Sequence, residues 1–215
     1  MSTKMIKDIS RKIVHAGKEL YDHGLVKGTS GNISARIPGA DTFLIKPSGA
    51  HMQRLKPEEL VLVYLEGNKI SGKRDVSAET PMHAAIYRAR RDVQAVVHTH
   101  APTATAFGIA GKEILPLQIE MFMLLSKAVP IIPFKQPGSK ALADAVQKTI
   151  MNYDVVILEN HGIVTVGSTL DSACSLNERV EEAAKIQLTV MMLSGGNVNS
   201  LAELKKKFKT QNTVE

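Results

Sequence analysis

The sequence has little of what disulfide-linked, membrane-spanning or base-stacking proteins need. Its 215 residues include one cysteine, no tryptophan and only 4% aromatic residues. One cysteine cannot form an internal disulfide, and so few aromatic rings make a platform for stacked bases hard to build. No apolar run approaches the roughly 20 residues that cross a bilayer, and the N-terminal MSTKMIKDIS has no signal-peptide core. We therefore expect a cytoplasmic protein without a membrane partner, in which Cys174 is a small buried hydrophobe.

The charge of the chain is basic but dispersed. The formal net charge is +6 and the sequence pI is about 9.4. The positive surplus is spread along the chain except for KKKFK at 205–209, which we interpret as a solvated tail. A surface of this kind suits a small anionic substrate, and we expect no nucleic-acid partner.

The composition predicts one folded unit. Hydrophobic residues make up 44% of the chain and charged residues 22%, which are ordinary values for a globular protein. We find no internal repeat and no linker that would divide the chain. We therefore expect one domain over residues 1–215, ending in a Lys-rich segment at 196–215.

Apolar spacing predicts the principal helices. One helix should run from Ile6 to Leu20 and end near Gly24, and a long last helix should cover about 170–193. Thr80 followed by Pro81 predicts an N-cap with proline at the first helical position. Further helices are expected near 101–109, 119–126 and 139–151. The last helix would place four charged residues on its polar side: Glu178, Glu181, Glu182 and Lys185.

Short apolar runs predict strands between these helices. They lie at 42–46, 60–67, 93–100 and 129–134. A hairpin is expected over 155–167, with a tight turn at Asn160, His161 and Gly162. Strands mixed with helices, with hairpins among them, predict an α/β sandwich with a largely antiparallel sheet.

The segment VVHTHAP at 96–102 places two histidines one residue apart at the end of an apolar run. In a strand, residues i and i+2 point to the same face, so His98 and His100 would lie side by side. Neutral imidazole nitrogens bind zinc at about 2.0–2.1 Å. His161, in the distant turn, is the best candidate for a third ligand, because the other histidines lie in helices or near loops. A His-x-His pair alone is equally compatible with polar residues at a strand end.

Five segments, taken together, resemble the successive motifs of one family. They are GTSGNIS at 28–34, KPSG at 46–49, SAETPMH at 77–83, HTHAPTATAF at 98–107 and ENHGIVTVG at 159–167. Their order and spacing, over about residues 5–195, resemble the class II aldolase/adducin family, and within it the L-fuculose-1-phosphate aldolases. The resemblance implies a single-domain α/β/α sandwich with a mainly antiparallel central sheet. It also implies a homotetramer with active sites at subunit interfaces and one zinc ion per subunit.

The resemblance assigns roles to residues of this chain. It makes His98, His100 and His161 the zinc ligands. It places Glu79 at the catalytic carboxylate, which in the family can also occupy the metal before substrate displaces it. The loops that bind phosphate in the family correspond to Gly31, Asn32, Ser48, Gly49, Ser77 and Ala78. Backbone amides at glycines, polar side chains and the start of a helix can hold an anion there without a lysine.

The implied reaction is the cleavage of a ketose 1-phosphate similar to L-fuculose 1-phosphate into dihydroxyacetone phosphate and an aldehyde. A zinc ion held by three neutral imidazoles keeps its full charge and would stabilise the enediolate of the three-carbon fragment. Glu79 would move a proton near the breaking bond, and this role requires a raised pKa.

Glu120 departs from the fuculose-phosphate aldolase pattern, in which a tyrosine at this place assists protonation in the neighbouring subunit's site. Relatives that dehydrate methylthioribulose 1-phosphate have a glutamate in a comparable place but lack the equivalent of Glu79. This chain has both carboxylates, so 5-deoxyribulose 1-phosphate and methylthioribulose 1-phosphate are alternative substrates. The other interpretation of Glu120 is an exposed helix residue.

Other functions use the same scaffold. A sugar-phosphate epimerase is disfavoured because its motif has an aspartate where Glu79 stands. A dehydratase or a decarboxylase is compatible with the same enediolate chemistry. A non-catalytic adducin-like binding module is the least favoured alternative, since it has no reason to keep three histidines together with the carboxylate.

Overall fold

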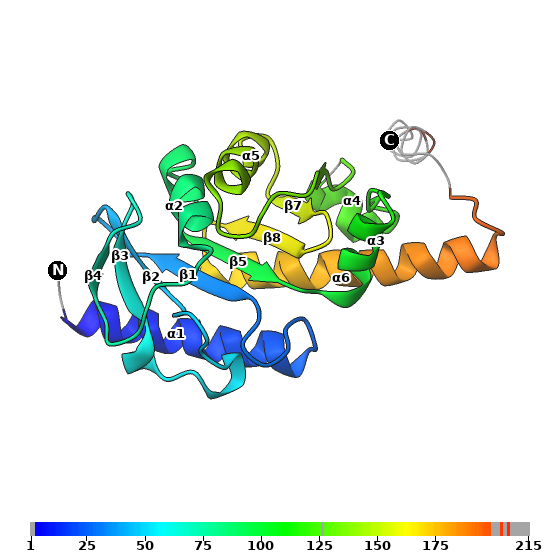
Figure 1. The fold of residues 1–215 in the computed structure, drawn as a ribbon. Coiled ribbons are helices and arrows are strands. Elements are labelled where there is room, and N and C mark those ends of the chain that lie inside the picture. The colour runs from blue at the N-terminus through cyan, green and yellow to red at the C-terminus, as the bar shows by residue number, and fades with distance from the viewer. Residues whose placement is uncertain (1–2, 126, 199–202, 204–205, 207–215) are drawn as a thin grey trace, which may run out of the picture.

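A central eight-stranded sheet organises the protein, which is seen here in a computed structural model (Figure 1). Residues 3–125, 127–198, 203 and 206 are described, so most of the predicted Lys-rich segment lies outside the described residues. The strands are β1 Asn32–Arg36, β2 Thr42–Ile45, β3 Val61–Tyr64, β4 Lys69–Ser71, β5 Ala95–Thr99, β6 Ile131–Ile132, β7 Val155–Leu158 and β8 Gly162–Gly167. The helices are α1 Thr3–Asp22, α2 Thr80–Ala89, α3 Pro102–Ile109, α4 Ile119–Leu125, α5 Lys140–Ile150 and α6 Leu170–Leu193, with short 3₁₀ helices η1 Met52–Arg54 and η2 Pro57–Glu59.

The sheet is mainly antiparallel, as predicted. Its strand order is β4-β3-β2-β1-β5-β8-β7-β6, and the pairing of β6 with β7 is parallel while the other pairs are antiparallel. The predicted hairpin is β7 and β8, in which Leu158 pairs with Gly162. Asn160 lies in its turn at φ 58°, a left-handed conformation that asparagine adopts more readily than most residues.

Helices cover both faces of the sheet and bury two separate apolar clusters. α1, α3 and α6 pack on one face, and α2 and α5 pack on the other (Figure 1). Successive residues of β5 alternate between the faces, so Val97 joins the first cluster and Val96 joins the second. The arrangement confirms the predicted α/β/α sandwich. It also turns His98 toward the face that α2 and α5 cover.

Most element boundaries agree with the sequence, but the start of α2 differs. Glu79, rather than Thr80, is the N-cap residue. The Glu79 carbonyl accepts hydrogen bonds from the backbone N–H groups of Met82 and His83, at 3.0 and 3.3 Å, so Thr80 is already helical. The prediction of Thr80 as N-cap was therefore wrong by one residue, and Pro81 occupies the second helical position.

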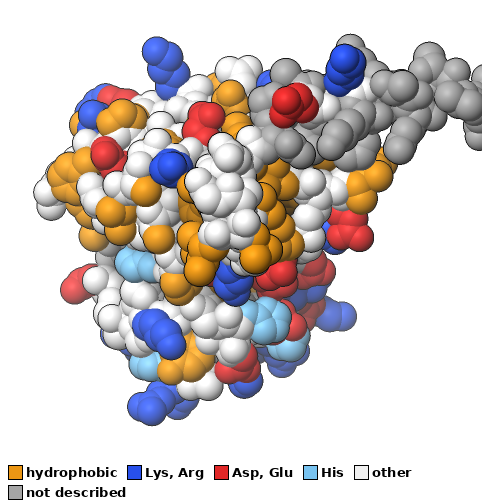
Figure 2. Space-filling model, turned by 90° about the vertical axis from the view of Figure 1, so that its right-hand side faces the viewer, with side chains coloured by type: hydrophobic (Ala, Val, Ile, Leu, Met, Phe, Trp, Pro, Cys, Tyr) orange, Lys and Arg blue, Asp and Glu red, His pale blue; other side chains and the backbone are white. Residues whose placement is uncertain are grey.

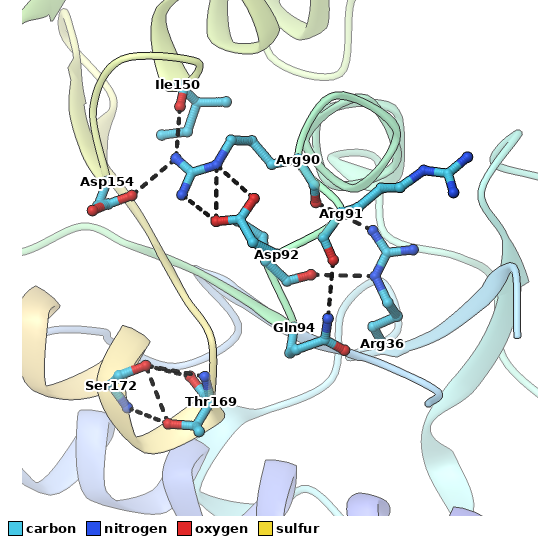
Figure 3. A network of polar contacts seen from close by, with 10 residues as sticks. Arg36, Arg90, Arg91, Asp92, Gln94, Ile150, Asp154, Thr169 and Ser172 are labelled. Atoms are coloured by element: carbon cyan, nitrogen blue, oxygen red, sulfur yellow. Dashed lines mark hydrogen bonds and ion pairs between the residues drawn. The ribbon is translucent and has the colours of Figure 1, made fainter. Parts of the chain in front are cut away.

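Arg90 joins the helices at the sheet end that lies away from the histidines (Figure 3). Its guanidinium donates to the Ile150 carbonyl at 3.0 Å, to Asp154 at 2.9 Å and to Asp92 at 2.5 Å. The hydrogen bond with Asp92 is the main cause that raises the pKa of Arg90. These bonds tie the end of α2 to the end of α5 and to the start of β7.

Two further predictions concern burial and membranes. Cys174 is 7% exposed and belongs to the apolar cluster between α6 and the sheet, as expected. Burial raises the pKa of its thiol to about 12. No helix in the described ranges is both long and apolar enough to cross a bilayer.

Candidate active site

Most of the predicted site residues, but not Glu120, gather at one end of the sheet. Because neighbouring strands are antiparallel, the end of β5, the start of β8 and the start of β1 meet there. His98 pairs with Asn32 of β1 on one side and with Val164 of β8 on the other. Residues separated by more than 60 positions are thus neighbours across two ladders.

Three imidazoles lie together at this end. His98, His100 and His161 each offer a ligand nitrogen, and these atoms lie within 4.8 Å of one another. The ring centroids of His98 and His161 are 4.6 Å apart, and that of His100 lies 5.1 Å from His98 and 5.3 Å from His161. His98 and His100 lie beside each other as their spacing predicted, and His161, the candidate from the distant turn, is their neighbour.

The backbone fixes the orientation of the His98 ring and allows the turn that holds His161 to approach it. Nδ1 of His98 lies 3.0 Å from the Ile163 carbonyl, which can accept only if this nitrogen bears the hydrogen. Its Nε2 is then a free lone pair directed at the cluster. Gly162 lets the turn that holds His161 approach β5 closely, since a Cβ atom there would lie 2.2 Å from the Thr99 carbonyl oxygen.

The three imidazoles fit a divalent cation. Nε2 of His98 lies 3.2 Å from Nε2 of His161. Two nitrogen ligands of a tetrahedral zinc ion are separated by about 3.3 Å, given bond lengths of about 2.0–2.1 Å. Nδ1 of His161 is buried and has no hydrogen-bond partner among the described residues, so protein contacts leave this nitrogen unsatisfied.

Burial also keeps the cluster neutral, as metal binding requires. It lowers the pKa of His161 to about 4 and the pKa of His98 well below its ordinary value, and in both cases the neighbouring imidazoles lower it further. For His100 the pKa is lowered by burial and then by the charge of Lys46. At neutral pH each ring can therefore offer a lone pair.

Glu79, predicted as a further metal ligand, is not among the residues whose ligand atoms gather in this cluster, but one of its carboxylate oxygens is unsatisfied. Its side chain is 7% exposed, and Oε2 is buried without a hydrogen-bond partner in the described part of the chain. Burial raises the pKa of Glu79, although a hydrogen bond from the Gly138 backbone opposes the shift. One turn further along α2, His83 bonds to Asn32, the residue paired with His98. This link places the start of α2 over the strand end that holds the histidines.

The three predicted anion-binding segments also converge here. The backbone N–H of Ser48 donates to the Asp75 carbonyl at 3.1 Å, which brings the second segment against the third. Asn32 and Ser77 are buried, whereas Ser48 and its neighbour Gly49 are exposed. The remaining members, Gly31 and Ala78, are buried and exposed respectively.

Lys46 connects two of these segments, and it was not among the site residues predicted from the sequence. Nζ of Lys46 donates to the carbonyls of Thr29 at 2.8 Å and Gly31 at 3.0 Å, and its side chain is 2% exposed. Burial, followed by the charge of Arg74, lowers the pKa of Lys46 to about 8. The sequence did contain a signal for this role of Lys46, because the residue begins the KPSG segment directly after a strand. An anion at this end of the sheet would therefore lie in a field of positive charge.

Glu120 is not brought to the histidines of its own chain. It lies in the first turn of α4 with its side chain 79% exposed, and its carboxylate is 3.8 Å from Nη1 of Arg179 on α6. Within the described ranges it has no part in the contacts of the histidine cluster. The described residues of one chain therefore give Glu120 no contact with this cluster.

Two buried polar residues of α6 support the segment that contains the histidines. The Thr99 hydroxyl donates to Asn177 at 2.7 Å. Glu181 accepts hydrogen bonds from the Thr103 backbone N–H and hydroxyl and from the Ala104 N–H, at 2.8–3.1 Å. Its side chain is only 2% exposed, so the prediction that it lies on the polar side of α6 was wrong. The unpaired N–H groups at the start of α3 explain why a carboxylate is buried there.

Comparison with known proteins identifies the family. The model of the class II aldolase and adducin N-terminal domain matches residues 11–188. The chain belongs to this family. It is 36% identical over 175 residues to 5-deoxy-D-ribulose 1-phosphate aldolase of Bacillus thuringiensis serovar kurstaki, covering 81% of this chain and 82% of that protein.

Other members of the class II aldolase family are comparably similar. The chain is 30% identical over 207 residues to 3-oxo-tetronate 4-phosphate decarboxylase of Haemophilus influenzae, covering 93% of this chain and 96% of the relative. A solved structure of L-fuculose 1-phosphate aldolase superposes with a TM-score of 0.85 at 28% identity, covering 97% and 98% of the two chains. The aldolase fold therefore spans nearly the whole chain, while the names of the relatives include more than one reaction.

Proposed function

We propose that this class II aldolase family member is a metal-dependent aldolase that cleaves a ketose 1-phosphate to dihydroxyacetone phosphate and an aldehyde. The observation that supports the proposal most is the cluster of three neutral imidazoles at one sheet end, which the bond between His83 and Asn32 links to the helix that begins at the buried Glu79. We propose zinc as the ion, one per subunit, held by His98, His100 and His161. We also propose that the enzyme works in the cytoplasm.

One group of residues would bind the phosphate of the substrate, and another would act near the bond that breaks. Asn32, Ser48 and Ser77 would hold the phosphate by hydrogen bonds, and Lys46 would supply positive charge behind them. When bound, a divalent cation supplies a Lewis acid for the carbonyl group of the substrate. Glu79 would hold the transferred proton at its Oε2 atom, which has no other partner in the described residues. Its raised pKa brings proton gain and loss closer to neutral pH.

Two substrates are the leading candidates. L-fuculose 1-phosphate has six carbons and would leave a three-carbon aldehyde, whereas 5-deoxyribulose 1-phosphate has five and would leave a two-carbon aldehyde. The relative from Bacillus thuringiensis supports the second, and so does a carboxylate in place of tyrosine at Glu120. Methylthioribulose 1-phosphate differs from the second by a thioether and belongs in the same comparison. Both kinds of cleavage release dihydroxyacetone phosphate.

The test is product identity with purified, zinc-loaded protein. Each ketose 1-phosphate is supplied in turn, and dihydroxyacetone phosphate is measured by its reduction in a coupled assay. We expect dihydroxyacetone phosphate to form together with an equal amount of aldehyde. Release of carbon dioxide from a 3-oxo-tetronate 4-phosphate, without cleavage of any ketose 1-phosphate, would instead identify a decarboxylase like the Haemophilus influenzae relative.

Glu79→Gln tests the assigned proton transfer. The variant keeps the size of the side chain and the N-cap backbone, so we expect normal folding and normal zinc content. Turnover should fall at least a hundredfold, in line with the usual contribution of general acid–base catalysis of about 10²–10⁴. Turnover equal to that of the unchanged protein would remove Glu79 from the mechanism.

We also propose a homotetramer in which a neighbouring chain completes each site. Apolar side chains gather on the side of the molecule toward which α6 extends (Figure 2). The large exposed apolar residues in the described parts of α3, α4 and α6 are Ile109, Ile119, Met123, Leu124, Leu188, Met192 and Leu193. Light scattering after size-exclusion chromatography should give four times the mass of 23.4 kDa, and a monomer with full activity would contradict the proposal.

A further inference from the structure

A chain of buried hydrogen bonds leads from the sheet interior to the anion-binding segments. Oγ of Ser34 lies 2.8 Å from the Tyr87 hydroxyl and 2.7 Å from Nδ1 of His83. Nε2 of His83 bonds to Oδ1 of Asn32. Ser34, His83 and Tyr87 are fully buried, and Asn32 is 5% exposed. No part of the proposed reaction uses His83.

The Tyr87 end of this series of hydrogen bonds decides which group donates at each step. Ser34 is the only hydrogen-bond acceptor for the Tyr87 hydroxyl among the described residues, so the hydroxyl hydrogen is directed to Ser34. The Ser34 hydroxyl then donates to Nδ1 of His83, and Nε2–H of the ring donates to Asn32. If the chain ran the other way, the Tyr87 hydrogen would have no acceptor among the described residues, at a fully buried position.

The ring of His83 can donate only one hydrogen bond. Complete burial lowers the pKa of His83 to about 3, so the imidazole is neutral at neutral pH. A neutral imidazole donates through one nitrogen and accepts through the other, and the Ser34 hydroxyl makes Nδ1 the acceptor. The amide of Asn32 must therefore offer its oxygen to His83.

We propose that His83 is a positioning residue that turns the Asn32 amide so that its NH₂ group, and not its oxygen, faces the bound phosphate. The neighbouring Gly31 carbonyl is already bonded to Nζ of Lys46, which removes a second acceptor from the anion's surroundings. The amide hydrogens and the lysine thus present donors to the anion, whereas a reversed Asn32 amide would present a lone pair and repel it. The proposal rests on the proposed function only in that it takes phosphate as the ligand.

Binding of inorganic phosphate to the zinc-loaded protein, measured by calorimetry, tests this role. His83→Leu removes the donor and leaves the Asn32 amide free to reverse, and we expect phosphate affinity to fall roughly tenfold. His83→Gln keeps an N–H group that can reach Asn32 and should restore most of the affinity. Ile86→Ala, one turn along the same buried face of α2, is the matched control: it should lower stability and leave phosphate affinity unchanged.

A kinetic comparison separates positioning from general damage. In the aldol direction, His83→Leu should raise KM for dihydroxyacetone phosphate but leave KM for unphosphorylated dihydroxyacetone unchanged. Equal losses for the two donors, or unchanged phosphate affinity in a folded His83→Leu protein, would overturn the proposal.

The hydrogen on the His83 ring can also be located in the unchanged protein, which decides the matter if the leucine variant does not fold. ¹⁵N shifts of the ring should show the hydrogen on Nε2, and a hydrogen on Nδ1 would overturn the proposal. The proposed reaction and the proposed role of His83 can each be refuted without the other. Tight phosphate binding with the hydrogen on Nε2 but no aldol cleavage would refute only the proposed reaction. Aldol cleavage with the hydrogen on Nδ1 would refute only the role of His83.

Discussion

Replacing Glu181 with alanine should damage both the fold and the proposed metal site, although this residue is not part of the histidine cluster. Three donors at the start of α3 would lose their acceptor: the Thr103 N–H, the Thr103 hydroxyl and the Ala104 N–H. Hydrogen bonds to a charged acceptor contribute about 1.5–3 kcal/mol each, and breaking a buried charged contact costs about 3–5 kcal/mol in all. The side chain is 2% exposed, so solvent screening does not reduce this figure.

The expected loss is therefore about 4 kcal/mol of the free energy of unfolding. For a chain of this length it corresponds to a fall in Tm of roughly 10 °C. Because Thr103 lies three residues after His100, the loosened backbone should also weaken metal binding, by roughly tenfold. Glu181→Gln keeps one acceptor oxygen and should lose less than half as much stability.

Urea unfolding and thermal denaturation measure the first effect, and competition with a metal indicator measures the second. Glu182→Ala is the matched control, since Glu182 is the next residue of α6 and is exposed. Its effect should stay within about 0.5 kcal/mol. If Glu181→Ala were no less stable than Glu182→Ala, the account of α3 as a helix held by a buried carboxylate would be refuted.

Three further predictions test other parts of the structure. Gly31→Ala should destabilise the protein by at least about 1–2 kcal/mol in urea unfolding, because φ is +67° and a Cβ atom would lie 2.8 Å from the His98 carbonyl oxygen. The pKa of Lys46 falls from 10.5 to about 8 on burial, so the folded chain binds fewer protons between these pH values and stability should rise with pH there. Compared with Lys46→Met, the unchanged protein should gain roughly 2 kcal/mol in urea unfolding between about pH 7.5 and 9.5; equal pH dependence would contradict the burial of the charge. Cys174, with a pKa of about 12, should react with iodoacetamide far more slowly in the folded protein than in urea at the same pH, and equal rates followed by mass spectrometry would contradict its burial.

Periodicity in the sequence was sufficient to place most helices and strands. The bounds predicted for the last helix are those of α6, whose Thr169 N-cap forms a reciprocal pair of hydrogen bonds with Ser172 (Figure 3). The hairpin could be predicted because Asn160 and Gly162 suit a tight turn between two apolar runs. Local patterns of this kind depend on neighbouring residues, which the sequence shows directly.

Contacts between distant segments could not be predicted in the same way. Glu181 looks like a surface residue by charge, and only the approach of α3 supplies the three donors that make its burial favourable. Lys46 and His83 likewise become informative only when the sheet brings them to Gly31 and Asn32. Resemblance to a family identified the three imidazoles, but the residues that support them belong to the packing of this fold.

The ladder between β5 and β8 has one consequence for redesigning the protein. It joins five residue pairs, from Ala95 with Gly167 to Thr99 with Ile163. One residue inserted within β5 would reverse the faces of everything beyond it and carry His98 to the side of α1 and α6. The connection at 37–41, between β1 and β2, lies at the opposite end of the sheet and includes exposed residues. Added peptides, reporter tags or new chain ends therefore belong at 38–41, beyond the buried Ile37, where lengthening the backbone leaves the three imidazoles in register.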